Sequence, residues 1–350
     1  MGAITSQSKD GHITKSGGTM FKRRLGRSDL EVGAMGLGCW AIGGPWDWLE
    51  KDGSTGPTGW GQVDDAESIR AIRYALDAGI NFFDTAANYG CGHSEQVLAQ
   101  AVAGRRDKVI LATKFGYVVD EEKRIVTETD EIVPRIRQEC EDSLRRLKTD
   151  YIDLYQFHVN EYPPEKAAEV RDVLETLVDE GKIRWYGWST DNVEGARVFA
   201  QGPHCTAIQH VLNMQYNVPQ MLAVCEEHDQ ASINRTCLGM GMLTGKFNRD
   251  TKFPEDDVRR GWDLQAERPT KNLQHIQSVR KMFADAGDSR TPAQIALAWI
   301  WTCSTHTIPI PGFRDLAQVK ENIQAMEFGL LSNEQMKKID EIYERTPILS

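Results

Sequence analysis

Four side chains in this sequence could together deliver a proton to a carbonyl oxygen. Asp84 and Tyr89 lie in the segment 84–95, and Lys114 and His158 end the next two apolar runs. A tyrosine hydroxyl has an ordinary pKa of about 10, and a neighbouring ammonium lowers that pKa by stabilising the phenolate. An aspartate could hold the lysine charged and in place, while a histidine could bond and polarise a substrate carbonyl. The set predicts carbonyl reduction by hydride transfer, with Tyr89 as the general acid.

Each of these residues also has a plainer explanation. Asp84 could be a satisfied carboxylate at a strand end, Lys114 a surface cation and Tyr89 a packing residue. His158 could be a core histidine bonded to a carbonyl group. A different chemistry is open as well, because a lysine in a barrel can form a Schiff base, which would make Lys114 the nucleophile of an aldolase. The occurrence of all four at matching strand ends favours the first interpretation.

The elements that must position these residues follow an alternating pattern of strands and helices. Predicted strands cover 80–84, 109–113, 151–158, 184–189, 206–211, 231–237, 307–310 and 327–330. Predicted helices cover 64–79, 94–101, 131–146, 164–180, 193–199, 219–228, 272–286, 292–302 and 333–345. No GxGxxG segment follows a strand, which disfavours a doubly wound dinucleotide domain. Eight strands with helices between them predict an α/β fold of the (β/α)8 TIM barrel type, whose functional residues gather at the carboxyl ends of the strands.

Composition limits the function further. The 350 residues include 51 acidic and 41 basic side chains, a net charge of -10 that disfavours binding to nucleic acid. No apolar run approaches the roughly 18 residues that span a membrane. The 7 cysteines are scattered without a CxxC pair, so we expect no metal site and a reducing, cytoplasmic location. Residues 1–20 are predicted to be a disordered extension or leader, and 21–350 a single barrel domain.

Several motifs are spread over almost the whole chain. They are the segments 24–32, 35–40, 78–90 with Ser94 and Glu95, 149–158, 181–189, 291–299, and 308–314 with Gln318, Glu321 and Asn322. Together they resemble the motifs of the aldo-keto reductases, in the bacterial branch related to general-stress and potassium-channel β-subunit-like reductases. The resemblance implies a barrel with an N-terminal β-hairpin, and with a C-terminal helix and loops over the barrel.

The resemblance implies a catalytic tetrad of Asp84, Tyr89, Lys114 and His158, and NADPH as the cofactor, with NADH possible but weaker. Ser189 and Thr190 would hold the nicotinamide carboxamide. Asn213 stands near the position of a glutamine that completes this contact in the family, so Gln209 is an alternative. The full set implied for the cofactor is Cys39, Trp40, Ser189, Thr190, Asn213, Arg235, Thr236, Cys237, Leu238, Gly239, Gly241, Lys246, Gly312, Arg314, Gln318, Glu321 and Asn322.

Two arginines have separate implied roles toward this cofactor. Arg235 stands where the family has a tyrosine that stacks on the nicotinamide ring. Its charge would oppose the cationic oxidised ring, so we expect it either to turn toward the pyrophosphate or to favour the reduced cofactor. Arg314 is placed to pair with the 2'-phosphate of NADPH, because a guanidinium suits a bidentate phosphate contact.

Tryptophans dominate the segment before the catalytic strand. Trp40, Trp46 and Trp60 are predicted to line the substrate pocket, and Trp48 lies within the insertion-like segment 45–59. Flat indoles with few charged neighbours suit a small uncharged carbonyl, such as a hydroxy-aldehyde or a sugar-derived aldehyde, with a polyol as the reverse substrate. Some of these indoles could instead pack only against the barrel. An alternative function is a redox-sensing module that binds NADPH and turns over slowly; no obligate protein partner is evident.

Overall fold

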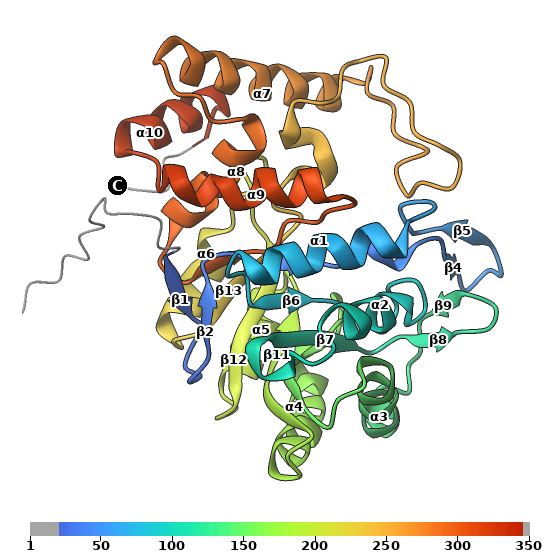
Figure 1. Ribbon diagram of the computed structural model, residues 1–350. Helices are drawn as coiled ribbons and strands as arrows, with labels where there is room; N and C mark the ends of the chain where they lie inside the picture. The colour runs from blue at the N-terminus through green and yellow to red at the C-terminus, as the bar shows by residue number, and fades with distance from the viewer. Residues whose placement is uncertain (1–20, 346–350) are drawn as a thin grey trace, which may run out of the picture.

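A computed structural model describes residues 21–345 as a barrel of parallel strands surrounded by helices (Figure 1). The predicted extension at residues 1–20 lies outside the described residues. The strands follow the order β14-β13-β12-β11-β10-β7-β6-β3. Their bounds are β3 Leu37–Gly38, β6 Phe82–Asp84, β7 Ile110–Phe115, β10 Ile152–Phe157, β11 Ile183–Ser189, β12 Cys205–Val211, β13 Ala231–Arg235 and β14 Thr307–Pro309.

The first and last strands close this sheet on itself. Gly38 forms a parallel bridge with Gly312, which lies just beyond β14. The backbone N–H of Gly38 donates to the Pro311 carbonyl at 3.1 Å. A Cβ atom at Gly38 would come within 2.8 Å of the Ile310 carbonyl oxygen, so a side chain here would force the two strands apart. The predicted (β/α)8 barrel is therefore confirmed, with a glycine at its seam.

One strand assignment from the sequence was wrong, and one strand was missed. The predicted strand at 327–330 is in fact the end of helix α9, Leu316–Phe328, and the stretch beyond it. Val319, Asn322 and Ala325 are buried at helical spacing, and Gly329 follows with a φ of 73°. The eighth barrel strand is β3 instead, whose two residues are too few to show strand periodicity.

Helices cover the outside of the barrel, and a hairpin closes the end where the barrel strands begin, at the left in Figure 1. The hairpin strands are β1 Lys22–Arg24 and β2 Glu31–Gly33, and Leu25, Leu30 and Val32 pack into the barrel interior. No helix within residues 21–345 combines the length and the apolar character needed to cross a membrane. The helices are α1 Asp65–Asp77, α2 His93–Ala101, α3 Ile136–Leu147, α4 Pro164–Asp179, α5 Val193–Ala200, α6 Pro219–Glu227, α7 Glu267–Asp285, α8 Pro292–Cys303, α9 and α10 Asn333–Ile342.

A second, smaller sheet lies beside the carboxyl ends of the barrel strands and was not predicted. The segment 45–59 forms a hairpin of β4 Asp47–Leu49 and β5 Thr55–Pro57. Strand β4 pairs in parallel with β9 Ile125–Thr127, which pairs with β8 Val118–Asp120. Trp46 packs against Cys91 and Val126 beneath this sheet. The sheet therefore holds the tryptophan-rich segment against the barrel.

Candidate active site

The structure brings the four predicted catalytic residues together. Asp84 ends β6, Tyr89 follows in the loop before α2, Lys114 lies in β7, and His158 comes directly after β10. The Lys114 Nζ donates to Asp84 Oδ1 at 2.5 Å, to the Thr85 carbonyl at 2.8 Å and to Tyr89 Oη at 3.1 Å. An ammonium has three N–H donors, so all three are in use. Because Tyr89 Oη accepts from Lys114, its own proton is free to be donated into the cavity.

Two glutamines hold the second oxygen of Asp84. Gln156 Nε2 donates to Asp84 Oδ2 at 2.9 Å, and Gln209 Nε2 donates to the same oxygen at 2.8 Å. All three side chains are buried. A buried carboxylate is costly unless its oxygens are bonded, and here both are. The amides and Lys114 therefore satisfy both oxygens of Asp84 and fix its orientation.

The charges of Lys114 and Tyr89 depend on each other. Burial acts to lower the pKa of Lys114, but the adjacent Asp84 carboxylate and the Tyr89 hydroxyl outweigh it and raise the pKa above its ordinary value. Burial raises the pKa of Tyr89, and the Lys114 ammonium opposes that rise without cancelling it. The expected effect of Lys114 is present, but the net pKa of Tyr89 lies above its ordinary value rather than below it. Tyr89 is thus protonated at neutral pH, as a proton donor must be.

His158 completes the group as a neutral imidazole. Burial, with the positive charges of Lys114 and Arg235, holds the pKa of His158 well below its ordinary value. Its ring lies 5.8 Å from the Tyr89 ring, between centroids, at 77°. A neutral imidazole can donate one N–H to a carbonyl oxygen without adding a charge to the site.

The geometry disfavours the aldolase interpretation. A Schiff-base lysine must reach its substrate as an uncharged amine, usually because its pKa is depressed. Lys114 is 0% exposed, its three donors are occupied, and its pKa is raised. No group of three or more His, Cys, Asp or Glu side chains within residues 21–345 is arranged to hold a metal ion.

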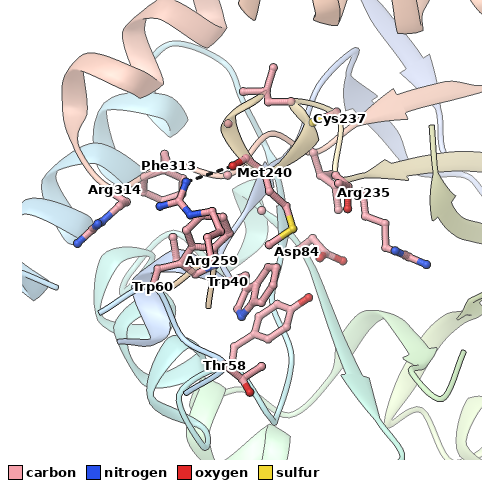
Figure 2. Close-up of a pocket in the computed structure, with 18 of the residues that line it drawn as sticks. Trp40, Thr58, Trp60, Asp84, Arg235, Cys237, Met240, Arg259, Phe313 and Arg314 are labelled. Atoms are coloured by element: carbon pink, nitrogen blue, oxygen red, sulfur yellow. Dashed lines mark hydrogen bonds between the residues drawn. The ribbon is translucent and has the colours of Figure 1, made fainter. Parts of the chain in front are cut away.

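A cavity of about 770 Å³ opens above this group (Figure 2). Asp84, Tyr89 and His158 lie at its base, and Trp40, Trp46, Trp48 and Trp60 all contribute to its wall. The predicted cofactor residues that line the cavity are Trp40, Ser189, Arg235, Thr236, Cys237, Leu238, Gly241, Lys246, Gly312, Arg314, Gln318, Glu321 and Asn322.

Four predicted cofactor residues do not line the cavity. The Thr190 hydroxyl donates to the Asn160 carbonyl and accepts from the Asn192 N–H. Asn213 Oδ1 accepts the N–H groups of Gln215 and Tyr216 within its own turn, and its Nδ2 donates to the Thr236 carbonyl, just after β13, at 2.9 Å. Cys39 is fully buried, and Gly239 is buried at the start of the short 3-10 helix Gly239–Thr244. Gln209, the alternative to Asn213, does line the cavity.

Arg259, Trp60, Asp257 and the Met240 carbonyl form a set of contacts, here called the Arg259 clasp, along one side of the cavity. The sequence did not reveal it. The Arg259 guanidinium lies 4.4 Å from the Trp60 ring centroid and pairs with Asp257 at 2.7 Å. It also donates to the Met240 carbonyl at 3.1 Å, drawn as the dashed line in Figure 2. Trp60 and Asp257 form an antiparallel backbone bridge. The clasp therefore joins the loop after β13 to the tryptophan-rich segment.

Two arginines stand on opposite sides of the cavity (Figure 2). Arg314 is exposed, and its guanidinium donates to the Gln62 carbonyl at 2.9 Å. Arg235 is paired with Asp191, a residue of the cavity rim that the sequence did not single out. The Asp191 carboxylate therefore compensates the charge of Arg235.

One of the missed residues left a signal in the sequence. Gln156 interrupts an apolar run two positions before His158, and residues two apart in a strand face the same side. A polar residue on the inner face of a barrel strand needs a partner, which here is Asp84. Asp191 and Arg259 left no such signal, because Arg235, which pairs with Asp191, and Trp60, which Arg259 contacts, are distant from them in the sequence.

Comparison with known proteins agrees with this geometry. The model of the aldo/keto reductase family matches residues 34–344. The aldo-keto reductase YhdN of Bacillus subtilis is 32% identical, with 91% of this chain and 92% of that protein covered. The solved glycerol dehydrogenase AKR11B4 of Gluconobacter oxydans is 33% identical, covers 92% of this chain and 94% of its own, and has a TM-score of 0.77. An aldo/keto reductase from Klebsiella pneumoniae, solved with NADP and acetate, is 25% identical, covers 93% of this chain and 96% of its own, and has a TM-score of 0.66. The chain therefore belongs to the aldo/keto reductase family, as its sequence motifs predicted.

Proposed function

We propose that this protein is an NADPH-dependent oxidoreductase that reduces small aldehydes and ketones to alcohols, and oxidises polyols in the reverse direction. The observation that carries the proposal is the bond from Lys114 Nζ to Tyr89 Oη, at 3.1 Å. It directs the Tyr89 proton away from Lys114 and toward the cavity. The Asp84 carboxylate keeps Lys114 charged, so the phenolate left after proton transfer has a compensating ammonium beside it.

Each catalytic residue has one task in this mechanism. His158 donates a hydrogen bond to the substrate carbonyl oxygen and fixes its approach, and Tyr89 gives that oxygen its proton. Asp84 and its two glutamines hold Lys114 in position. NADPH, when bound, supplies the hydride to the carbonyl carbon. In the reverse direction the Tyr89 phenolate accepts the alcohol proton.

The residues of the cavity suit NADPH. Asn322 Nδ2 is buried at the cavity wall without a hydrogen-bond partner among residues 21–345, beside Glu321, so this pair offers a donor and an acceptor to a heteroaromatic base. Lys246 and Arg314 supply positive charge for phosphate groups. Gly241, with a φ of 98°, lets the backbone approach a pyrophosphate, and a Cβ there would lie 2.7 Å from the Phe247 ring. The Klebsiella relative, a complex with NADP, supports this choice.

A small, uncharged, hydroxyl-bearing carbonyl fits the substrate end of the cavity. Trp40, Trp48 and Trp60 provide aromatic walls, while Asn88 and Asn160 provide amide groups. Aromatic walls with a few neutral polar groups favour hydroxy-aldehydes and sugar-derived carbonyls over carboxylate-bearing ones. The similarity to a glycerol dehydrogenase supports the same class.

The test is a screen of NADPH consumption with small aldehydes and ketones, such as glyceraldehyde and methylglyoxal. Tyr89→Phe should lower kcat/KM by about a hundredfold or more while NADPH still binds. Tyr117→Phe is a matched control, because Tyr117 also lines the cavity but donates only to the His158 carbonyl. We expect it to retain most of the activity. NADPH binding without turnover of any carbonyl would refute the enzymatic proposal and favour a sensing module.

A further inference from the structure

Asp191 lies where three consecutive barrel strands end. It follows β11, and its Oδ1 accepts the N–H of Val211, the last residue of β12, at 2.9 Å. Its Oδ2 pairs with Arg235, the last residue of β13. The Asp191 N–H donates to Asn160 Oδ1 at 2.8 Å. Both carboxylate oxygens and the backbone are therefore bonded, and this fixes the carboxylate in place.

The pair formed by Asp191 and Arg235 lies at the rim of the cavity, partly open to solvent. Both residues line the cavity, and their side chains are 37% and 28% exposed. The charge of Arg235 reaches the reacting groups, because it acts to lower the pKa of both Tyr89 and His158. A compensating carboxylate beside Arg235 therefore changes the potential inside the cavity.

We infer that Asp191 sets how strongly the protein discriminates between the oxidised and reduced forms of its cofactor. The inference rests on the proposed function. The oxidised nicotinamide ring is a cation and the reduced ring is neutral, so the two forms differ by one charge near Arg235. With Asp191 paired to it, Arg235 presents little net charge and both forms are accepted. Without that carboxylate, Arg235 repels the oxidised form.

This assigns Asp191 a role in the direction of the reaction. Alcohol oxidation begins with the oxidised cofactor, and carbonyl reduction begins with the reduced one. At a given cofactor pool, the ratio of the two dissociation constants sets how much of the protein holds each form, and therefore how readily each direction begins. Asp191 is thus a positioning residue that keeps the oxidative direction accessible despite the arginine.

The test measures the dissociation constants of NADP and NADPH separately, by quenching of tryptophan fluorescence, for the whole protein and its variants. Asp191→Asn keeps an acceptor for the Val211 N–H but removes the charge beside Arg235. We expect NADP to bind about fivefold more weakly, as befits partly exposed charges, and NADPH to change less than about twofold. Asp191→Glu should restore the original ratio because it restores the carboxylate.

Asp229→Asn is the matched control. It breaks another Asp–Arg pair, with Arg24 at 2.6 Å, just before the start of β13 and far from the cavity. It should leave both dissociation constants unchanged. If Asp191→Asn weakens the binding of NADP and NADPH equally, or leaves the ratio of their dissociation constants unchanged, this inference is overturned while the proposed function stands. A wild-type protein that binds neither form would overturn the proposed function together with it.

Discussion

Removal of the Lys114 ammonium tests the centre of the site most directly. Lys114→Met keeps a side chain of similar length but leaves Asp84 Oδ1 without the donor that lies 2.5 Å away, and leaves the Thr85 carbonyl and Tyr89 Oη without theirs. A buried ion that loses its partner costs about 3–5 kcal/mol of unfolding free energy. Gln156 and Gln209 still donate to the other Asp84 oxygen, so we expect the lower part of this range, about 3 kcal/mol.

The double variant separates stability from catalysis. Asp84→Asn with Lys114→Met removes both charges, so no unpaired ion remains, and we expect a loss of only about 1–2 kcal/mol for the missing hydrogen bonds. The two single losses should therefore not add. Activity should behave differently, because neither variant supplies an ammonium to Tyr89. We expect kcat/KM to fall by about a hundredfold or more in both.

The assays are urea unfolding and initial rates of carbonyl reduction with the same preparations. Unfolding midpoints and slopes of the wild type, both single variants and the double variant give the coupling free energy. Additive losses would show that Asp84 and Lys114 are not an energetically coupled pair. Near wild-type turnover in Lys114→Met would refute the role of its ammonium in proton transfer.

Three further results are expected. Gln156→Leu removes one hydrogen-bond donor from Asp84, so the negative potential near Tyr89 grows and the pKa of Tyr89 rises further. The alkaline limb of the kcat/KM profile should therefore move up by about one pH unit, and an unmoved limb would contradict this. The pKa of the buried His210 is lowered to about 4 in the folded protein, whereas unfolded chains bind that proton near pH 6.5. Its neutral form is therefore favoured by folding, and unfolding free energy should fall by about 3 kcal/mol from pH 6.5 to 4, less steeply in His210→Gln. Arg314→Ala should weaken binding of NADPH far more than that of NADH, and equal losses would reject its pairing with the 2'-phosphate.

Long apolar runs made the base of the site predictable. β7 and β10 each contain six buried residues, so their position along the chain was evident, and the residues at their ends are Lys114 and His158. A closed barrel then gathers all strand ends on one face. Periodicity failed where elements are short, as in β3, or where a strand assignment was made from a few residues, as at 327–330.

Orientation was harder to predict than position. Gln209 and Asn213 are four residues apart, and the sequence analysis placed the contact with the nicotinamide carboxamide at Asn213, with Gln209 as the alternative. In the structure Gln209 shares the inner face of β12 with Ala207, whereas Asn213 lies beyond the strand and bonds within a turn. The alternation of faces along a strand distinguishes them only when the end of the strand is known. Asp191 and Arg235, 44 positions apart, meet only through the barrel.

The two parts of the cavity are built on different supports, and this has a consequence for specificity. The residues that hold the proton donor, Asp84, Lys114 and the two glutamines, lie on strands β6, β7, β10 and β12, whose inner faces are fixed by the closed barrel. Three tryptophans of the cavity wall, Trp46, Trp48 and Trp60, lie in or directly beside the hairpin of β4 and β5. The pairing of β4 with β9 and the contact of Arg259 with Trp60 hold this hairpin in place. Contacts that depend on loops tolerate change better than contacts between barrel strands. Substitutions in the hairpin can therefore alter which carbonyl is accepted while the bond from Lys114 to Tyr89, and hence proton transfer, stays as it is.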